Sequence, residues 1–245
     1  MEFTEEKINH GIESINVHNE TTLHSQLKSY FMEDGCVTEA RHGRYIIDVI
    51  KDDLLIEIQT RNFSSIRKKI ENLILSDKVL LVYPIIEEKI IVKIDKSGHL
   101  EYERKSPKKG KPIDVFNELI RIPSLVNEGN FSMMLMMIHV KEFRKDDGKG
   151  SWRRKGVSLI DTELTCVERE INLKDKSDFM KLVYGHAGKS TENASFFKEF
   201  NSKTLAKKLG INASLSRKIL YSLKHMGAIS ECGKIGNLIL YKVLE

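Results

Sequence analysis

Hydrophobic residues recur at helical spacing in two segments near the start of the chain. Within residues 19–34, Leu23, Leu27 and Phe31 fall on one face of a helix, and residues 64–75 repeat the same spacing. An apolar face with this period is typical of an amphipathic α-helix that packs against a core. We therefore predict one helix in each segment.

Extended segments separate and follow these two helices. A continuous apolar run at residues 79–85 comes after the second helix, as in a strand that is buried on both faces of a sheet. Polar residues and a glycine divide the region between the helices into three extended segments, at 36–41, 45–50 and 54–59. The order helix, three strands, helix, strand predicts a mixed α/β sheet over about residues 19–95.

The remainder of the chain has two parts of different character. Residues 101–112 are polar and basic, as in a loop, and two strand-like segments, 131–143 and 157–168, flank a basic tip. A polar linker separates the last sixty residues from the rest of the chain. These patterns predict an α/β domain at 1–100, an α+β extension with a basic hairpin at 101–185, and a small α+β domain at 186–245.

Composition narrows the class of protein. The 245 residues are 40% hydrophobic and 31% charged, which is enough for a buried core and unlike a disordered chain. The longest apolar run, 133–138, is too short to cross a bilayer. Cys36, Cys166 and Cys232 form no CxxC pair, which indicates a reducing compartment. We therefore expect a cytoplasmic protein that does not enter a membrane.

Positive charge is concentrated at the C-terminal end. Residues 186–245 hold ten Lys and Arg residues against four Asp and Glu residues, whereas the preceding part holds thirty against thirty-one. A basic domain beside a nearly neutral body favours a polyanionic partner. The alternative is a lysine-rich surface that only meets water.

Two carboxylates and an amide fall on the last two of the three short strands. Asp48 ends the apolar segment YIIDV, and Glu57 and Gln59 lie two residues apart within LLIEIQT, so that their side chains share one face. A carboxylate between isoleucines in a buried strand is costly unless something binds it. Mg²⁺ can do so with one or two carboxylates and several waters. Alternatively, both acids pair with basic neighbours, such as Arg41, Arg44 or Arg61.

This arrangement, an aspartate at a strand end, a turn and E-x-Q on the next strand between two helices, resembles the PD-(D/E)xK nuclease superfamily. Its restriction-endonuclease-like and Holliday-junction-resolvase-like branches are the most similar, and the resemblance covers residues 19–95. It implies that Asp48 and Glu57 bind Mg²⁺ or Mn²⁺, and that the catalytic residues are Glu20, Asp48, Glu57 and Gln59. Gln59 stands where the family usually has lysine, which orients water and stabilises negative charge; glutamine offers only hydrogen bonds.

The resemblance implies a metal-dependent DNA endonuclease that hydrolyses phosphodiester bonds. The missing lysine supports an alternative, a catalytically inactive DNA-binding transcriptional or architectural regulator. A third interpretation is a protein-interaction module. His24 lies on the same helical face as Glu20 and could touch a substrate phosphate, although a packed or exposed histidine is the plainer interpretation. Glu39 could reach the site from the first strand, but a surface carboxylate is the plainer interpretation there.

Residues 200–244 follow the order helix, glycine, helix, glycine, hairpin. One helix is expected at 203–209 before Gly210, and a second at about 213–226 before Gly227, because glycine commonly ends helices in a left-handed conformation. The phrases TLAKKLGI, SRKILYSLKHMGAI and GNLILYKV resemble the winged helix-turn-helix family.

This second resemblance implies DNA binding, in which the second helix enters the major groove with its N-terminal part and the wing contacts the backbone. The implied contacts are Asn212, Ser214, Ser216, Arg217 and Lys218, with Lys224 and Lys234 nearer to phosphate. Many winged helices instead bind proteins or dimerise. A homodimer is a further expectation, since cutting two strands needs two sites.

The tip of the middle hairpin, GKGSWRRK, holds the only tryptophan of the chain beside basic residues. Arginine can contact phosphate and an aromatic side chain can stack on a base. Trp152, Arg153 and Arg154 are therefore candidate nucleic-acid-binding residues. Alternatively, the tryptophan packs back onto the sheet.

Overall fold

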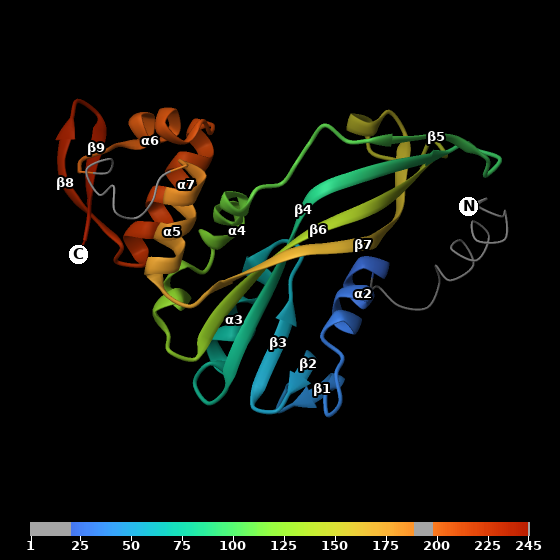
Figure 1. Ribbon diagram of the computed structural model, residues 1–245, viewed down its shortest axis with the longest axis horizontal. Helices are drawn as coiled ribbons and strands as arrows, with labels where there is room; N and C mark the ends of the chain where they lie inside the picture. The colour runs from blue at the N-terminus through green and yellow to red at the C-terminus, as the bar shows by residue number, and fades with distance from the viewer. Residues whose placement is uncertain (1–20, 189–197, 245) are drawn as a thin grey trace.

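The computed structural model describes residues 21–188 and 198–244 of the chain (Figure 1). Its first part contains both predicted helices and the strands around them. In chain order these are α2 (Thr22–Tyr30), β1 (Val37–His42), β2 (Tyr45–Lys51), β3 (Leu54–Ile58), α3 (Phe63–Leu73) and β4 (Lys78–Ile94). The expected mixed α/β fold is confirmed.

The next part of the chain completes the same sheet. Its elements are β5 (Leu100–Lys105), η1 (Pro112–Val115), α4 (Phe116–Leu119), η2 (Pro123–Asn127), β6 (Phe131–Asp146), η3 (Trp152–Arg154) and β7 (Val157–Leu173). The strand order is β1-β2-β3-β4-β6-β7, with β5 paired to β4. β3, β4 and β6 are parallel to one another, and the other pairs are antiparallel. The boundary expected at residue 100 therefore runs through one sheet.

Strand β4 is longer than the apolar run at 79–85 predicted. It continues to Ile94 through a register shift between Ile86 and Glu88, and the segment expected as a loop from residue 101 begins as strand β5. Pro84 is tolerated within it because β3 ends opposite Val82, whose carbonyl accepts the N–H of Gln59. Pro84 lies two residues after Val82, so its backbone nitrogen points to the same side of β4. It lies beyond the end of β3, where no strand needs the N–H that proline lacks. Together with β5, β6 and β7, the far half of β4 forms an arm that extends from the body (Figure 1).

Two hydrophobic clusters lie on opposite faces of the sheet. On one face, Leu23 and Leu27 of α2 pack against side chains that include Val49 and Ile56. On the other face, α3 packs into a larger cluster through residues such as Phe63. The amphipathic spacing of both helices thus has the packing role that the sequence predicted.

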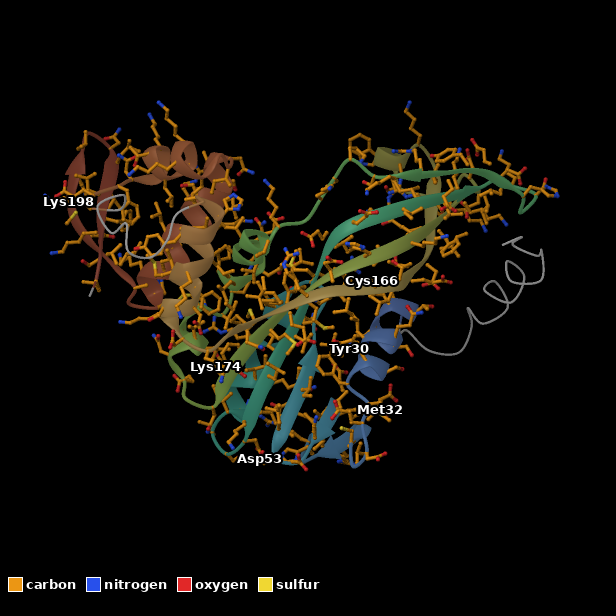
Figure 2. The ribbon with its side chains drawn as sticks, viewed as in Figure 1. Tyr30, Met32, Asp53, Cys166, Lys174 and Lys198 are labelled. Atoms are coloured by element: carbon orange, nitrogen blue, oxygen red, sulfur yellow. The ribbon has the colours of Figure 1, made fainter. Side chains whose placement is uncertain are left out.

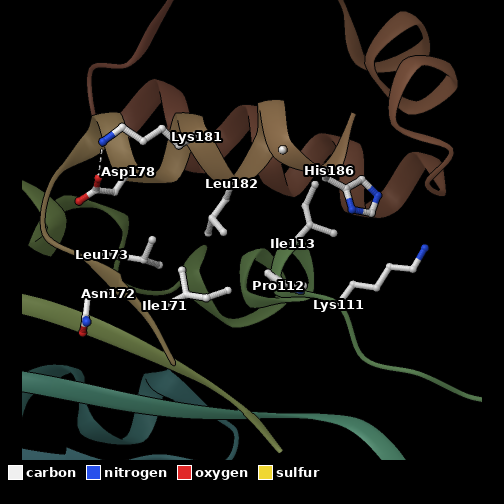
Figure 3. A pocket seen from close by; sticks show the side chains of 11 residues that line it. Lys111, Pro112, Ile113, Ile171, Asn172, Leu173, Asp178, Lys181, Leu182 and His186 are labelled. Carbon is white, nitrogen blue, oxygen red and sulfur yellow. Dashed lines mark hydrogen bonds and ion pairs between the residues drawn. The ribbon is translucent and has the colours of Figure 1, made fainter. Parts of the chain in front are cut away.

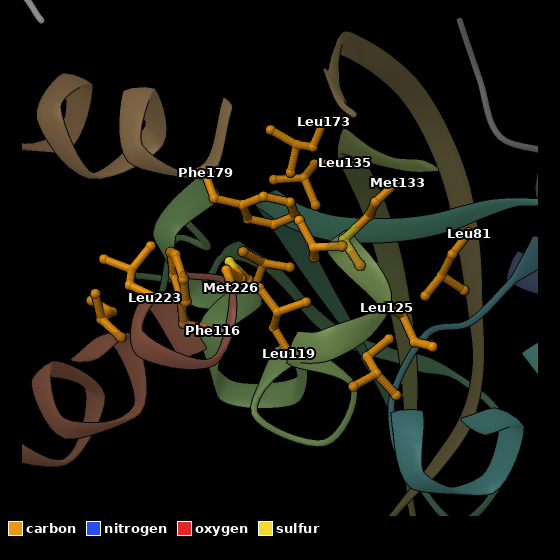
Figure 4. Packing of buried hydrophobic residues seen from close by; sticks show 14 of the residues in the cluster. Leu81, Phe116, Leu119, Leu125, Met133, Leu135, Leu173, Phe179, Leu223 and Met226 are labelled. Atoms are coloured by element: carbon orange, nitrogen blue, oxygen red, sulfur yellow. The ribbon is translucent and has the colours of Figure 1, made fainter. Parts of the chain in front are cut away.

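The C-terminal elements belong to the larger cluster. They are α5 (Lys176–His186), α6 (Ser202–Leu209), α7 (Ala213–His225), β8 (Ile229–Ile235) and β9 (Leu238–Val243), with a bridge between Phe200 and Tyr241. The rings of Phe116 and Phe179 lie 6.3 Å apart, and Leu223 of α7 joins the same cluster as the sheet residues (Figure 4). The last helices therefore share a core with the sheet.

Both glycines expected to end helices adopt left-handed conformations. Gly210 has a φ of 61° and Gly227 a φ of 67°, which any side chain would make unfavourable. Within the described residues, no helix combines the length and apolar character that crossing a membrane requires.

Candidate active site

Asp48 and Glu57 occupy opposite positions in the backbone register of β2 and β3, and burial and the charge of Asp48 both raise the pKa of Glu57. The register pairs Val49 with Ile56, and its continuation by one residue sets Asp48 opposite Glu57. Ile47 packs in the cluster on the α3 face, whereas Val49 packs in the cluster on the α2 face. In a regular strand these two side chains would share a face. The regular alternation of β2 therefore breaks at Asp48.

The neighbouring strand is irregular at the same point. Glu39 lies between the paired residues Thr38 and Ala40 of β1, and its φ is 50°. This left-handed conformation is uncommon for a residue other than glycine. The Glu39 carboxylate lies 2.5 Å from the Nζ atom of Lys28 on α2, so it is held by an ion pair away from Glu57.

The carboxylate of Asp48 is held by two donors. Its Oδ2 atom accepts the backbone N–H of Ile58 at 2.8 Å and lies 3.4 Å from Nε2 of His24 on α2. The same Nε2 atom lies 3.0 Å from the carbonyl oxygen of Ile58. Burial raises the pKa of Asp48, but the contacts with His24 and Ile58 outweigh it, and the net pKa lies below the ordinary value. His24 is thus a packed histidine that contacts Asp48 and the backbone of Ile58.

Glu57 is buried and pairs with a lysine that the sequence analysis did not select. Its residue is 4% exposed, and Oε1 lies 2.5 Å from Nζ of Lys69 on α3. The same ammonium donates to the carbonyl oxygen of Ile46 at 2.5 Å. Burial raises the pKa of Glu57 to about 7, although Lys69 opposes that shift. An ion pair of the expected kind is present, but its partner is Lys69.

Two of the three arginines considered as partners are engaged elsewhere. The Nε atom of Arg41 donates to the carbonyl of Gly43, and the guanidinium of Arg44 lies over the ring of Tyr45. Lys69 becomes visible as a partner only when α3 is placed on the sheet, because it lies twelve positions after Glu57 in the sequence. The helical spacing of 64–75 was the available signal, since it puts Lys69 beside the buried face.

Gln59 turns toward the start of α3. Its amide nitrogen donates to the carbonyl of Arg61 and lies 3.4 Å from the hydroxyl of Ser65. Its backbone N–H continues the ladder to Val82. Glu20, the fourth predicted catalytic residue, lies outside the described residues.

The donor set at Asp48 and Glu57 fits a hard divalent cation. Oxygen ligands from one or two carboxylates, completed by water, are what Mg²⁺ and Mn²⁺ take. Glu57 Oε1 is buried, and the Lys69 ammonium lies 2.5 Å from it without a hydrogen bond of regular geometry. A buried oxygen with an unused lone pair is costly in an apolar setting, and a cation or its bound water would satisfy it.

The residues predicted to contact DNA on α7 divide into two groups. Ser216 is fully buried and donates to the carbonyl of Ser202 at 2.7 Å, so its predicted contact is wrong. Lys218 donates to the side chain of Asn117 on α4 at 2.9 Å, which directs it toward the body. Asn212 caps α7 by accepting the N–H of Leu215.

The second group is exposed. Ser214 and Arg217 lie on the open side of α7, and Lys234 is exposed on β8. Lys224 is also exposed but lies 2.5 Å from Glu231. Tyr221, which the sequence analysis did not select, is 48% exposed, and its ring centroid lies 4.0 Å from that of His225. Such a surface offers both charge and an aromatic face.

Trp152 lies at the tip of the arm, in η3. It is 84% exposed, so it does not pack back onto the sheet, and Arg154 beside it is exposed as well. The side chain of Arg153 lies outside the described part of the structure. The tip therefore presents an aromatic and a basic side chain to solvent.

A pocket of about 550 Å³ lies apart from these residues, between α5, η1 and β7 (Figure 3). Its lining is mainly apolar and includes Ile113, Ile171 and Leu182, with Lys111 and His186 on one side. None of its lining residues belongs to the site of Asp48 and Glu57.

The family match covers the sheet and its two acids. Residues 21–174 match the family described as Domain of unknown function (DUF8091), and the chain belongs to that family. The match begins before α2 and ends just after β7, so it includes Asp48, Glu57 and Lys69. A relative from Treponema pallidum (strain Nichols), described as an uncharacterized protein, is 30% identical over 164 residues. That segment is 66% of this chain and 65% of the relative, so the chain covers less than two thirds of that protein. No solved structure matches the chain.

Proposed function

We propose that this protein is a metal-dependent nuclease that hydrolyses phosphodiester bonds in DNA. The observation that carries the proposal is a pair of carboxylates at opposite register positions of neighbouring strands, with an ammonium beside one of them. Asp48 lies opposite Glu57 in the register of β2 and β3, burial and the charge of Asp48 raise the pKa of Glu57, and Lys69 Nζ lies 2.5 Å from Glu57. The element order from α2 to β4, with β2 and β3 antiparallel and β3 and β4 parallel, supports the resemblance to PD-(D/E)xK nucleases.

Each residue has a role that its surroundings support. Asp48 and Glu57 hold Mg²⁺ or Mn²⁺, which when bound neutralises the scissile phosphate and lowers the pKa of a bound water. His24 and the Ile58 N–H keep Asp48 ionised and oriented. Lys69 supplies the positive charge that Gln59 lacks, and it can stabilise the negative charge that develops on the phosphate. Gln59, tied to Arg61 and Ser65, fixes the start of α3 beside the site.

The C-terminal elements support delivery to DNA. Helices α5, α6 and α7, the Phe200–Tyr241 bridge and the hairpin of β8 and β9 follow the order of a winged helix-turn-helix. In that family the exposed side of the last helix enters the major groove, and here that side carries Ser214, Arg217 and Tyr221. Lys234 on the wing and Trp152 and Arg154 on the arm are further contacts in this proposal. Two copies of the chain would supply the two sites that cutting both strands requires.

A second candidate is a DNA-binding regulator without catalytic activity. One observation favours it: the amide nitrogen of Gln59 is engaged by Arg61 and Ser65, so it does not point at a substrate. In this alternative the ion pair of Lys69 and Glu57 is structural. The basic C-terminal surface would then bind DNA without cleavage.

Incubation of the purified chain with plasmid, single-stranded and branched DNA separates the two candidates. We expect cleavage of at least one substrate with Mg²⁺ or Mn²⁺ and none with a chelator. Binding of DNA without cleavage under any metal condition would favour the regulator. If the chain neither binds nor cleaves any of these DNA substrates, both candidate functions are rejected.

A further inference from the structure

A second group of metal-ligating side chains lies on the neighbouring strands β6 and β7. His139 pairs with Cys166 in the register of the two strands, and Glu168 lies two residues beyond Cys166. The ligand atoms of these three residues all lie within 4.8 Å of one another. They lie on strands that carry none of the candidate catalytic residues. Figure 2 places Cys166 midway along β7, near the point where the strands pass into the arm.

The sheet itself brings the three side chains to one place. The register of β6 and β7 shifts between Met137 and Ile138 and again between His139 and Val140. Because of the first shift, Glu168 has no ladder partner on β6, whereas the residues on either side of it are paired. A residue bulged out of a ladder can turn its side chain toward a neighbour's face. Glu168 Oε2 accordingly lies 4.0 Å from His139 Nε2, which is beyond hydrogen-bond length.

Two of the nearby cationic side chains are paired with other carboxylates. Arg169, next to Glu168, makes two hydrogen bonds with Glu87, and Lys105 lies 2.5 Å from Glu88. Arg169 therefore does not neutralise Glu168. A pocket of about 320 Å³, lined in part by His139 and Glu168, opens beside the group.

The chemistry of the three ligands selects the kind of metal. Thiolate and imidazole ligands favour Zn²⁺ and similar transition metals, whereas Mg²⁺ takes oxygen ligands. Zinc–nitrogen and zinc–sulfur bonds of about 2.0–2.3 Å in a tetrahedron place ligand atoms roughly 3.5 Å apart. Because Cys166 and Glu168 are exposed, their side chains can close the remaining ångström by rotation.

We propose that His139, Cys166 and Glu168 form a binding site for Zn²⁺ or a similar transition-metal ion, with water in the fourth position. Binding would displace the thiol proton of Cys166 and use the neutral imidazole of His139. The ion would join β6 to β7 where their ladder is interrupted, at the base of the arm. Because His139 and Glu168 both line the pocket of about 320 Å³, a further ligand could reach the ion, as in zinc centres with three protein ligands.

Cobalt titration tests this site directly. The full chain, treated with chelator and exchanged into metal-free buffer, is titrated with Co²⁺ alone while its absorption spectrum is recorded. We expect a thiolate-to-cobalt charge-transfer band that Zn²⁺ abolishes by displacement. An excess of Mg²⁺ should leave the band unchanged, because Mg²⁺ does not compete for thiolate. The spectrum does not depend on DNA cleavage, so failure of the nuclease proposal and failure of this site are distinguishable.

Single substitutions assign the ligands. Cys166→Ser should abolish the band, and His139→Ala or Glu168→Gln should weaken Co²⁺ binding by at least about tenfold. Cys232→Ser, which removes an exposed cysteine on β8, is the matched control and should leave the band intact. Circular dichroism spectra are recorded to check that each variant is folded. The proposal is overturned if the parent shows no band at any Co²⁺ concentration, or if the band survives Cys166→Ser.

Discussion

Lys69 of α3 places its Nζ atom 2.5 Å from Oε1 of Glu57 on β3. The ammonium lies beside a carboxylate that is 4% exposed, and its second contact, with the Ile46 carbonyl, fixes it at the edge of the site. In the proposed nuclease, Lys69 would supply from a helix the charge that the PD-(D/E)xK pattern usually places two residues after the glutamate. This relationship makes Lys69 the residue on which the catalytic proposal depends most.

Replacement of Lys69 tests that dependence. Lys69→Ala should lower metal-dependent DNA cleavage by about 10²-fold or more, because a positioned charge no longer stabilises the transition state. Lys68→Ala is the matched control, since Lys68 is an exposed neighbour on the same helix, and it should cleave normally. Cleavage rates at saturating metal make the comparison. Equal rates for the two variants would make Lys69 a structural partner of Glu57 only.

The raised pKa of Glu57 predicts a pH dependence with a definite sign. With a folded pKa of about 7 against an ordinary value of 4.5, the metal-free folded state holds a proton that the unfolded chain has released. The free energy of unfolding should therefore fall as pH rises from about 4.5 through 7. Glu57→Gln should remove that part of the dependence, and denaturant unfolding at several pH values measures it. An unchanged profile in the variant would place the titration elsewhere.

The same protonation should control metal binding. Because a cation needs the ionised carboxylate, the affinity for Mn²⁺ should increase as pH rises through about 7 in the parent. Calorimetric titration with Mn²⁺ at pH values on both sides of 7 would show this. An affinity independent of pH in this range would mean that Glu57 is not a ligand.

Asp48→Asn isolates the other carboxylate with little change of shape. The amide oxygen can still accept the N–H of Ile58, so the fold and thermal unfolding should change little, whereas Mn²⁺ affinity should fall by at least about tenfold. Asp53→Asn is the control, because Asp53 is exposed and pairs with Lys78. A variant at Asp48 that unfolds readily would instead show that the contact with His24 is structural.

DNA binding by the C-terminal surface should depend on salt. If Lys234 contacts a phosphate, Lys234→Ala should reduce the slope of log K against log salt by about one unit and weaken all sequences alike. Lys78→Ala, at the distant start of β4, should leave the slope unchanged. Arg217→Ala should change sequence preference, since Arg217 is exposed in the N-terminal part of α7. Fluorescence anisotropy with labelled duplexes at several salt concentrations gives these values.

The sequence predicted the individual helices and strands better than the way they combine into one sheet and one core. Amphipathic spacing located α2 and α3, and glycines located the ends of α6 and α7, because these signals are local. The polar segment around Glu87 concealed the continuity of β4, since a strand that passes into an exposed arm no longer needs apolar residues. The sharing of one core by Leu223 and the sheet was likewise invisible, because it depends on contacts between segments far apart in the chain.

The candidate site was predicted in part for the same reason. Asp48 and Glu57 were identified because strand register relates nearby residues on a hairpin. Lys69 was missed because its place depends on how α3 lies on the sheet. Ser216 was selected by its position in the second helix, but helical phase turns it inward to Ser202.

Cleavage of one supercoiled plasmid by five matched proteins tests the nuclease proposal most directly. The parent, Asp48→Asn, Lys69→Ala, Asp53→Asn and Lys68→Ala are compared with Mg²⁺, with Mn²⁺ and with chelator. We predict metal-dependent nicking or linearisation by the parent and by the two control variants, Asp53→Asn and Lys68→Ala, and at least about a 10²-fold loss in the other two. No cleavage by the parent with either metal, or equal cleavage by Asp48→Asn, would contradict a nuclease site at Asp48 and Glu57.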